Sequence, residues 1–325
     1  MTRPVLVTGG AGFIGSALVR RLAARGRAVR VLDDLSVGQR AYLQGISCEL
    51  VVGSLADPAV VVAAVTGVEA VVHLAARAGI PDSVGDPLGT FEANVAQTVG
   101  LLEAARRAGA RRFVFASSNA VLGPHEPPAD ETVLPRPASP YGASKLAGEA
   151  YVGAYAATYG LAACSLRFSN AYGPRSLHKR SVVAAWLRAA LVDASVTIHG
   201  DGEQTRDFVF VDDLAEAIAA ALAAPEDRVA GAIFQAGTGR ETTVNELAGA
   251  LEEALGRPVR ASHGPARAGD IARNASRVEL VAERLGWRAT MPLAGGLRRT
   301  VSWFEEALRD PALAGIAPDA RSGSD

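Results

Sequence analysis

The sequence predicts an α/β protein that combines a doubly wound parallel sheet with a smaller mixed α/β lobe. Short apolar runs alternate with amphipathic helical patterns through the first half of the chain, as in a parallel sheet covered by helices on both faces. A glycine-rich turn joins the first run to the first helical pattern, and the regular alternation ends after Asn170. We therefore expect one domain over residues 1–169, its sheet completed by about 207–236, and a second lobe mainly over 170–310.

The expected strands of the first domain are short runs rich in Val, Leu and Phe, whereas the expected helices repeat apolar residues every three or four positions. The first helix has Ile14, Leu18, Val19 and Leu22 on one face. In chain order, strands are expected at 5–8, 29–32, 50–52, 70–74, 112–117 and 162–168. Helices are expected at 15–25, 59–65, 90–108 and 140–159.

The second lobe is expected to begin with a helix at 182–191, a strand at 196–198 and a loop at 200–206. Runs at 208–211 and 232–235 are expected to return as strands to the main sheet, and helices are expected at 244–255 and 278–285. Asp212 and Asp213 are expected to cap a helix that starts at Leu214. The tail 311–325 is rich in Ala, Gly, Pro and Ser and is expected to be frayed.

The composition argues against several classes of protein. The 325 residues carry 33 basic and 34 acidic side chains, and this net charge of −1 argues against general binding to nucleic acid or anionic membranes. No apolar run of roughly 18 or more residues is present, so no transmembrane helix is expected. The first residues lack the apolar core of a signal peptide, and two cysteines cannot form a disulfide framework, so we expect a cytoplasmic protein. No metal site is expected, since His125, His199 and His263 are scattered without paired carboxylates.

The glycine-rich turn has the spacing Gly9-x-x-Gly12-x-x-Gly15, after a strand and at the start of a helix. Glycine permits the tight turn and the close approach of a pyrophosphate, and the helix N-terminus offers free N–H groups to phosphate. The second strand ends at Asp33, which lies 18 residues after Gly15 (33 − 15). An acidic residue there binds a ribose diol and repels a 2′-phosphate, which favours NAD over NADP. The alternative is an ordinary glycine turn.

Tyr141 and Lys145 are four residues apart in an expected helix, so they lie on one face. A free tyrosine has a pKa of about 10 and is almost wholly protonated at neutral pH. A positive charge about 5 Å away, at an effective dielectric constant of about 20, contributes roughly 3 kcal/mol to its ionisation. Lys145 and an oxidised nicotinamide together would therefore make Tyr141 a base at neutral pH. The alternative is a surface Tyr–Lys pair, although Lys145 and Lys179 are the only lysines among the 33 basic residues.

Over residues 4–305 the sequence resembles the extended short-chain dehydrogenase/reductase family, which has a Rossmann fold, and specifically its NAD-dependent nucleotide-sugar epimerases and dehydratases. The motifs that carry the resemblance lie along the whole first domain and into the second lobe. They are the glycine turn, Val31-Leu32-Asp33-Asp34-Leu35-Ser36, His73-Leu74-Ala75-Ala76, Ser117-Ser118, Tyr141-x3-Lys145, Arg167-Phe168-Ser169-Asn170-Ala171-Tyr172-Gly173-Pro174 and Gly200-Asp201-Gly202-Glu203-Gln204-Thr205-Arg206-Asp207-Phe208.

The resemblance implies NAD as the cofactor. It places Asp57 at the adenine edge and Lys145 at the nicotinamide ribose, and it makes Asn94 a helix residue that steadies the backbone of the site. His73 belongs to the strand-end motif, and we expect it to be structural. The cofactor-binding residues implied are Gly9, Gly12, Phe13, Ile14, Gly15, Asp33, Asp34, Ser36, Gly38, Asp57, Leu74, Ala75, Ala76, Asn94, Tyr141, Lys145 and Phe168.

The resemblance also implies a UDP-sugar as substrate, with Ser118, Tyr141 and Lys145 as the catalytic residues. Ser118 would hydrogen-bond the sugar 4-hydroxyl, and Tyr141 would take its proton. Arg206 and Arg267 would clamp the diphosphate, and Asp270 would bind the uridine ribose. The substrate-binding residues implied are Arg77, Ser118, Asn119, Tyr141, Asn170, Arg175, Ser181, Val182, Arg206, Arg267 and Asp270.

The residues after Ser118 favour one branch of this family. The 4,6-dehydratases carry Asp-Glu there as the acid and base that remove water, and UDP-glucuronate decarboxylases keep the Glu. This chain has Asn119 and Ala120, which cannot exchange protons near neutral pH. The expected reaction is therefore 4-epimerisation through a transient 4-keto sugar. The alternatives are a dehydratase or decarboxylase and, less favoured, a catalytically silent NAD-binding protein.

Two further expectations concern the sugar and the assembly. The basic stretch 175–180 could bind the carboxylate of UDP-glucuronate, or it could be a solvated loop or a pyrophosphate contact. The substrate therefore stays open between a UDP-hexose (UDP-glucose or UDP-galactose) and UDP-glucuronate. The resemblance implies a homodimer through a four-helix contact that uses residues 90–108 and 140–159. Small residues in the second helix (Ala143, Ala147, Ala150, Ala154) would permit close helix packing or would face the sheet.

Overall fold

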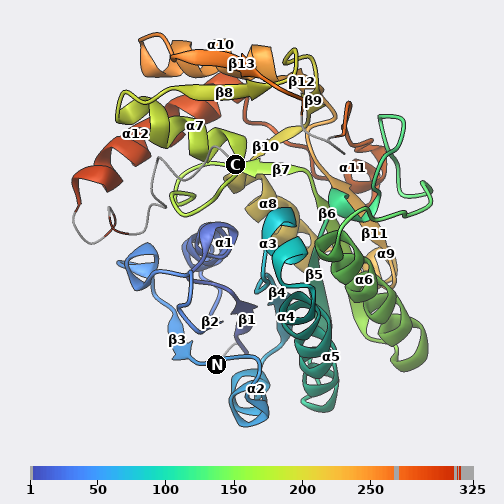
Figure 1. Ribbon diagram of the computed structural model, residues 1–325. Coiled ribbons are helices and arrows are strands. Elements are labelled where there is room, and N and C mark those ends of the chain that lie inside the picture. The colour runs from blue at the N-terminus through green and yellow to red at the C-terminus, as the bar shows by residue number, and fades with distance from the viewer. Residues whose placement is uncertain (1–2, 267–270, 311–312, 314, 316–325) are drawn as a thin grey trace.

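The protein is described here from a computed structural model, which covers residues 3–266, 271–310, 313 and 315. Its main sheet has seven strands, all paired in parallel, with helices on both faces (Figure 1). This confirms the predicted doubly wound parallel sheet. In sheet order the strands are β11 (Ile233–Ala236), β6 (Ala162–Phe168), β5 (Arg112–Ser118), β4 (Ala70–His73), β1 (Val5–Thr8), β2 (Val29–Asp33) and β3 (Glu49–Val52).

Alternation along the strands divides the interior of the first domain into two cores. In β1, Val5 and Val7 face a core shared with helices α1 and α8, whereas Leu6 faces a core shared with α2, α5 and α6. The strands β1, β4, β5 and β6 are therefore buried on both faces, which explains their nearly continuous apolar runs, whereas the edge strand β3 is partly exposed. The helices of this domain are α1 (Phe13–Ala24), α2 (Pro58–Val65), α3 (Ile80–Gly85), α4 (Pro87–Phe91), α5 (Gln97–Arg107), α6 (Pro140–Tyr159), α8 (Val211–Ala223) and α9 (Glu226–Val229).

Strand order reverses between β1 and β4, because the chain first builds β2 and β3 on one side and then β4, β5 and β6 on the other. Ligands of such sheets bind at this switch point, beyond the carboxyl ends of the strands. α6 brings its N-terminus close to this edge, and its ends are well defined. Ser139 accepts a hydrogen bond from Gly142 N at 3.1 Å, Pro140 occupies the first helical position, and Gly160 ends the helix in the left-handed conformation.

The second lobe has its own core, in which Trp186, Phe210, Leu247 and Phe304 are buried. Its helices are α7 (Val182–Leu191), α10 (Val244–Leu255) and α12 (Leu293–Arg309), and α11 (Glu279–Leu285) packs Val281 against the core of the first domain. Three small sheets complete it. They pair β7 (Asn170–Tyr172) with β10 (Phe208–Phe210), β8 (Val196–His199) with β13 (Ala261–Gly264), and β9 (Thr205–Arg206) with β12 (Thr242–Thr243).

The prediction that 208–211 returns to the main sheet is wrong. These residues form β10, which pairs with β7, and β7 extends the chain just beyond β6. Phe208 and Phe210 are buried in the core of the second lobe, so the apolar run serves that core. The other returning strand is confirmed, because β11 pairs with β6.

The predicted cap of the helix at Leu214 is also wrong. α8 begins at Val211, and Asp213 lies in its first turn. The Asp213 carboxylate accepts hydrogen bonds from Thr290 and from Met291 N, so it ties the segment before α12 to α8. α12 itself was not predicted. The expected tail 311–325 lies outside the described residues except for 313 and 315.

The helix expected at 90–108 begins earlier and is not uniform. α4 starts at Pro87, a π-helical turn covers Glu92–Ala96, and α5 continues to Arg107. π-helical turns are rare and occur frequently at functional sites. The π-helical turn contains Asn94, which is one of the residues predicted to belong to the site.

Candidate active site

The glycine turn at the carboxyl end of β1 is shaped by close backbone contacts. Gly9 has a φ of +68°, and a Cβ there would lie 2.8 Å from Ala75 N. A Cβ on Gly15 would collide with Gly9 O. α1 then begins without a side-chain cap and without an acidic residue in its first turn. The turn therefore presents a free helix N-terminus, the donor set that suits a diphosphate.

Asp33 lies at the carboxyl end of β2, next to this turn. Its carboxylate is buried and accepts hydrogen bonds from Ala11 N and Leu35 N, each at 2.9 Å. Burial raises the pKa of Asp33, and the two backbone N–H donors oppose that rise. A Cβ on Gly38 would lie 2.6 Å from Asp33 Oδ1, so glycine lets this loop close over the carboxylate. Each carboxylate oxygen keeps a lone pair for a ribose hydroxyl.

Two other residues predicted to bind the cofactor organise nearby loops. Asp34 is exposed and accepts hydrogen bonds from the backbone and the hydroxyl of Ser36. Asp57 caps α2 by accepting from Ala59 N at 2.9 Å. Their contacts with a cofactor stay predictions.

His73 at the end of β4 is fixed by two threonines. Its Nδ1 lies 2.8 Å from Thr8 Oγ1, and its Nε2 lies 2.8 Å from Thr98 Oγ1. Burial, with a smaller contribution from Lys145, lowers the pKa of His73 to about 3. A neutral ring with both nitrogens engaged joins β1, β4 and α5, which agrees with the expected structural role.

Asn94 braces the loop that follows β4. Its Oδ1 accepts from Arg77 N at 2.8 Å, and its Nδ2 donates to Arg77 O at 3.0 Å and to Ser144 Oγ at 3.0 Å. Asn94 therefore joins the π-helical turn, the loop of Leu74, Ala75 and Ala76, and α6. These hydrogen bonds fit the predicted steadying role of Asn94, and its part in cofactor binding stays a prediction.

Ser118 and Tyr141 come together at the carboxyl end of β5 and the first turn of α6. Burial raises the pKa of Tyr141, and the polar Ser118 side chain beside the phenol lowers it. The prediction that Lys145 and an oxidised nicotinamide together lower the pKa of Tyr141 enough to make it a base stays a prediction.

Lys145 lies one turn further along α6 and is buried. Its Nζ donates to Ala116 O at 2.9 Å and lies 6.0 Å from the centroid of the Tyr141 ring. Burial lowers the pKa of Lys145 to about 8, against the opposing charge of Glu149. The ammonium therefore remains mostly protonated at neutral pH and lies on the same side of α6 as the phenol.

The lowered pKa predicts a pH-dependent stability for the cofactor-free protein. The unfolded chain keeps the Lys145 proton up to a pKa of 10.5, whereas the folded protein releases it at about 8. Between these values the unfolded state binds more protons, so stability rises with pH. Relative to Lys145→Met, the wild type should gain about 3 kcal/mol in free energy of unfolding over this range. Urea unfolding at a series of pH values measures this gain. Parallel plots of the free energy of unfolding against pH for the two proteins would contradict the prediction.

The structure adds a buried ion pair that the sequence analysis missed. Arg167 Nε and Nη2 donate to the two oxygens of Glu149 at 2.8 Å each, and Ser117 Oγ donates to Glu149 Oε1 at 2.6 Å. The Arg167 and Glu149 side chains are 2% and 1% exposed. The pair joins α6 to β5 and β6 directly behind Lys145, so it fixes the position of the catalytic helix.

Asn119 points into a buried polar network. Its Nδ2 donates to Ser169 Oγ at 3.1 Å and to Ser276 Oγ at 2.9 Å. Ser169 in turn donates to Asp207, which also accepts the N–H of Thr238. Asn119 therefore links the end of β5 to the second lobe, and its contact with substrate stays a prediction.

The predicted diphosphate clamp is described only in part. Arg206 Nη1 donates to Ile271 O at 2.7 Å, so its guanidinium is held beside Ile271. Arg267 and Asp270 themselves lie outside the described residues. Asn170 is exposed in β7, and Ser181 and Val182 begin α7. Arg77 pairs with Asp86 at 2.5 Å.

The basic stretch 175–180 does not form one cationic cluster. Burial lowers the pKa of Arg175, whose electrostatic neighbours are Arg20, Asp212 and Tyr42. Arg180 is exposed and lies 3.4 Å from Asp82. Lys179 instead lies over the ring of Phe13. A single carboxylate site built from all these cations is therefore not supported.

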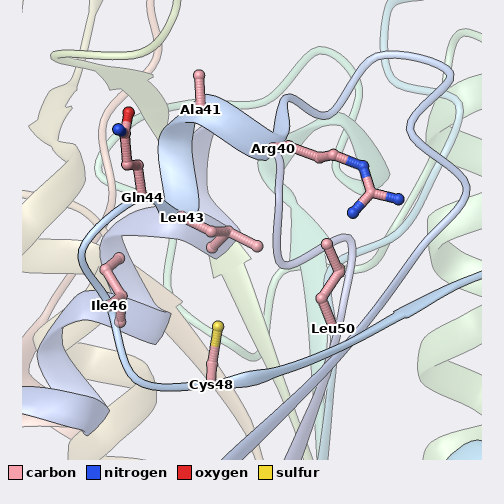
Figure 2. Close-up of a pocket in the computed structure, with 7 residues that line it drawn as sticks. All are labelled: Arg40, Ala41, Leu43, Gln44, Ile46, Cys48 and Leu50. Atoms are coloured by element: carbon pink, nitrogen blue, oxygen red, sulfur yellow. The ribbon is translucent and has the colours of Figure 1, made fainter.

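A hollow of about 430 Å³ lies away from this edge of the sheet (Figure 2). It lies between the short helix Arg40–Leu43 and the start of β3, and its lining is largely apolar. None of the predicted site residues lines it. The lining residues are Arg40, Ala41, Leu43, Gln44, Ile46, Cys48 and Leu50.

Comparison with known proteins agrees with this geometry. A family model described as the NAD dependent epimerase/dehydratase family matches residues 5–237. The chain belongs to the NAD-dependent epimerase/dehydratase family. It is 40% identical to a UDP-glucose 4-epimerase of Mycolicibacterium smegmatis over 313 residues, which covers 92% of this chain and 97% of that protein. It is 37% identical to a putative UDP-glucose 4-epimerase of Methanocaldococcus jannaschii, with 93% and 98% covered.

Solved structures of similar proteins have the same fold. The Thermus thermophilus UDP-glucose 4-epimerase in complex with NAD has a TM-score of 0.85 at 39% identity, with 94% of this chain and 99% of that chain covered. MoeE5 in complex with UDP-glucuronic acid and NAD has a TM-score of 0.86 at 34% identity, with 94% and 100% covered.

NAD is the cofactor of this family, and the residues at the switch point fit it. The glycine turn leaves space that a Cβ would fill, the N-terminus of α1 is uncapped, and Asp33 keeps lone pairs for a ribose diol. Along the described part of the chain, no helix is both long and apolar enough to cross a membrane.

The close contacts of the glycine turn predict that Gly15→Ala loses bound NAD. The new Cβ would push against Gly9 O and open the turn that receives the diphosphate. We expect the NAD content of the purified protein to fall at least about tenfold, since several hydrogen bonds are disturbed together. Gly249→Ala in α10 is the control, because a Cβ there meets nothing within 4 Å. Equal NAD content in the two variants would contradict the prediction.

Proposed function

We propose that this protein is a UDP-sugar 4-epimerase that interconverts UDP-glucose and UDP-galactose through a transient 4-keto sugar. The observation that carries the proposal is the placement of Ser118 beside the Tyr141 phenol, with the Lys145 ammonium 6.0 Å from the centroid of the Tyr141 ring. The relatives named UDP-glucose 4-epimerase, which match nearly the whole chain, support the same reaction.

Each residue of the site has a separate role in the proposed reaction. Ser118 hydrogen-bonds the sugar 4-hydroxyl, and Tyr141 accepts its proton as the C4–H bond breaks. Lys145 holds the nicotinamide ribose and adds positive charge beside the phenol. Bound NAD supplies the acceptor and then the donor of the C4 hydride. Tyr141 returns the proton when the keto group is reduced from the other face, so no net oxidation occurs.

The same site lacks the acidic and basic side chains that elimination requires. A dehydratase needs an acid and a base beside the sugar, but Asn119 is an amide and Ala120 has no polar side-chain group. The Asn119 amide is also committed to Ser169 and Ser276. The loss of water or of carbon dioxide is therefore disfavoured relative to epimerisation.

A substrate panel tests the proposal. Purified protein is incubated with UDP-glucose, UDP-galactose, their N-acetyl forms and UDP-glucuronate, and product mass and C4 configuration are read together. We expect conversion of UDP-glucose to UDP-galactose at unchanged mass. Conversion of UDP-glucuronate alone would assign the uronate instead, and loss of 18 or 44 mass units (about one water or one carbon dioxide) would refute epimerisation.

The exposed apolar side chains on α3, α4 and α6 support a homodimer. Val84, Leu88, Phe91 and Tyr151 are 64%, 78%, 51% and 43% exposed. Exposed apolar patches commonly mark contacts with other proteins. Ala143, Ala150 and Ala154 of α6 are also exposed, so they do not face the sheet.

This surface predicts that Leu88→Glu with Phe91→Glu converts a dimer to a monomer. Two carboxylates at the centre of an apolar contact would lose their hydration on association. Sedimentation equilibrium measures the mass of the particle. Leu134→Glu is the control, because Leu134 is 67% exposed outside these helices. A dimeric double variant, or a monomeric wild type, would contradict the proposed contact.

We also propose that the protein acts in the cytoplasm. Its two cysteines, Cys48 and Cys164, are both free thiols. Proteins of reducing compartments keep their thiols unpaired, which supports this location.

A further inference from the structure

Lys179 lies in the second lobe but reaches the first domain. Its Nζ is 5.3 Å from the centroid of the Phe13 ring, and Phe13 is the first residue of α1. Figure 1 shows the yellow-green segment between β7 and α7 passing beside α1. The second lysine of the chain therefore lies at the glycine turn, where the first domain receives its cofactor.

The backbone around Lys179 is firmly held. Lys179 N donates to Ser176 O at 2.9 Å, which closes a turn. The buried Arg188 of α7 donates through Nη1 to Lys179 O at 2.7 Å and to Leu177 O at 2.6 Å. The position of the side chain over α1 is thus set by the structure of the second lobe.

The Lys179 ammonium has no anionic partner within the described part of the chain. Burial lowers its pKa, and no carboxylate opposes this effect, whereas Glu149 opposes it at Lys145. Its neighbour Arg180 is exposed and has Asp82 nearby. A half-buried cation without a counterion is unfavourable. Here it also lies beside the positive N-terminus of α1, so both features favour an anion in the same place.

We propose that Lys179 binds the diphosphate of NAD from the side of the second lobe and so holds the dinucleotide between the two lobes. The N-terminus of α1 and the ammonium would then neutralise the diphosphate together. Such a contact would keep the cofactor bound through many turnovers, as a reaction without net oxidation requires. The inference rests on the family's cofactor and not on which sugar is epimerised. The diphosphate of a sugar nucleotide has the same chemistry, and the experiment distinguishes the two.

The test measures the release of NAD from the holoenzyme without any sugar. Bound NAD is exchanged against isotopically labelled NAD, and the rate is compared for wild type, Lys179→Gln, Lys179→Met, Lys179→Arg and Arg180→Gln. We expect release to be at least about tenfold faster in the Gln and Met variants, since a charged hydrogen bond is lost. Lys179→Arg and Arg180→Gln should remain close to wild type. Bound NADH should be released faster by the same factor, because it carries the same diphosphate.

Two results would overturn the proposal. Wild-type release rates in both neutral variants would show that the ammonium does not touch NAD, and weaker binding of UDP in those variants would then assign it to the sugar nucleotide. Slow release from Lys179→Met but fast release from Lys179→Gln would mean that packing on Phe13, and not charge, retains the cofactor. Far-UV circular dichroism of each holoenzyme checks that the variants are folded.

Discussion

Tyr141→Phe is expected to lower kcat by about a thousandfold or more while the protein keeps its bound NAD. The substitution removes the hydroxyl beside Ser118 and leaves the ring in place. Proton transfer by a positioned side chain contributes about 10²- to 10⁴-fold to a rate, and this hydroxyl is the base that begins the reaction. The rate of UDP-galactose formation and the NAD content of the purified protein are measured together.

Tyr151→Phe is the matched control for this experiment. Tyr151 lies on the same helix α6 but is exposed, so losing its hydroxyl should leave kcat near the wild-type value. A Tyr141→Phe enzyme with at least a tenth of wild-type activity would mean that another group takes the proton. Loss of NAD from that variant would mean that the phenol holds the cofactor rather than acting as the base.

Arg167→Met is expected to lower the free energy of unfolding by about 3–5 kcal/mol. It would leave the Glu149 carboxylate buried without its bidentate partner, and breaking a buried ion pair has a cost of about this size. Ser117 Oγ would remain as a hydrogen-bond donor to that carboxylate, but it carries no charge. Denaturant unfolding of the NAD-loaded variants at a fixed NAD concentration measures the difference.

A second variant separates the missing partner from a simple packing defect. Replacing both residues, as Arg167→Met with Glu149→Leu, removes the uncompensated charge and should restore a large part of the lost stability. Arg27→Met tests the size of the effect at the surface, where the Arg27 and Glu69 side chains are 39% and 41% exposed. For Arg27→Met we expect the free energy of unfolding to change by less than about 1 kcal/mol. Equal losses at the two arginines would contradict the role given to burial.

The parts of the fold that local patterns determine were predictable. The central strands could be recognised as short apolar runs because residues buried on both faces are nearly all apolar. The glycine turn could be recognised from the spacing of its glycines. β10 was misassigned because an apolar run shows that a strand is buried but not which core buries it. α12 was missed although Leu297, Val301 and Phe304 have helical spacing and are buried.

The site residues that lie in short sequence motifs could be predicted. The contacts between segments that are far apart in the sequence could not. Ser118, Tyr141 and Lys145 lie in short motifs and come together as expected. The pairing of Glu149 with Arg167, and the contact of Lys179 with Phe13, join residues from different elements. Neither contact has a periodic signature, because each depends on how α6 and the second lobe pack against the sheet.

Epimerisation by this site requires oxidation and then reduction of the same C4 carbon without release of the hydride. Incubation of the enzyme with UDP-glucose that carries deuterium at C4 tests this directly, with the label in UDP-galactose read by NMR and mass spectrometry. We predict that the label is retained at C4, without exchange with solvent and without NADH in solution. UDP-galactose that has lost the deuterium, or a product of lower mass than its substrate, would contradict the account.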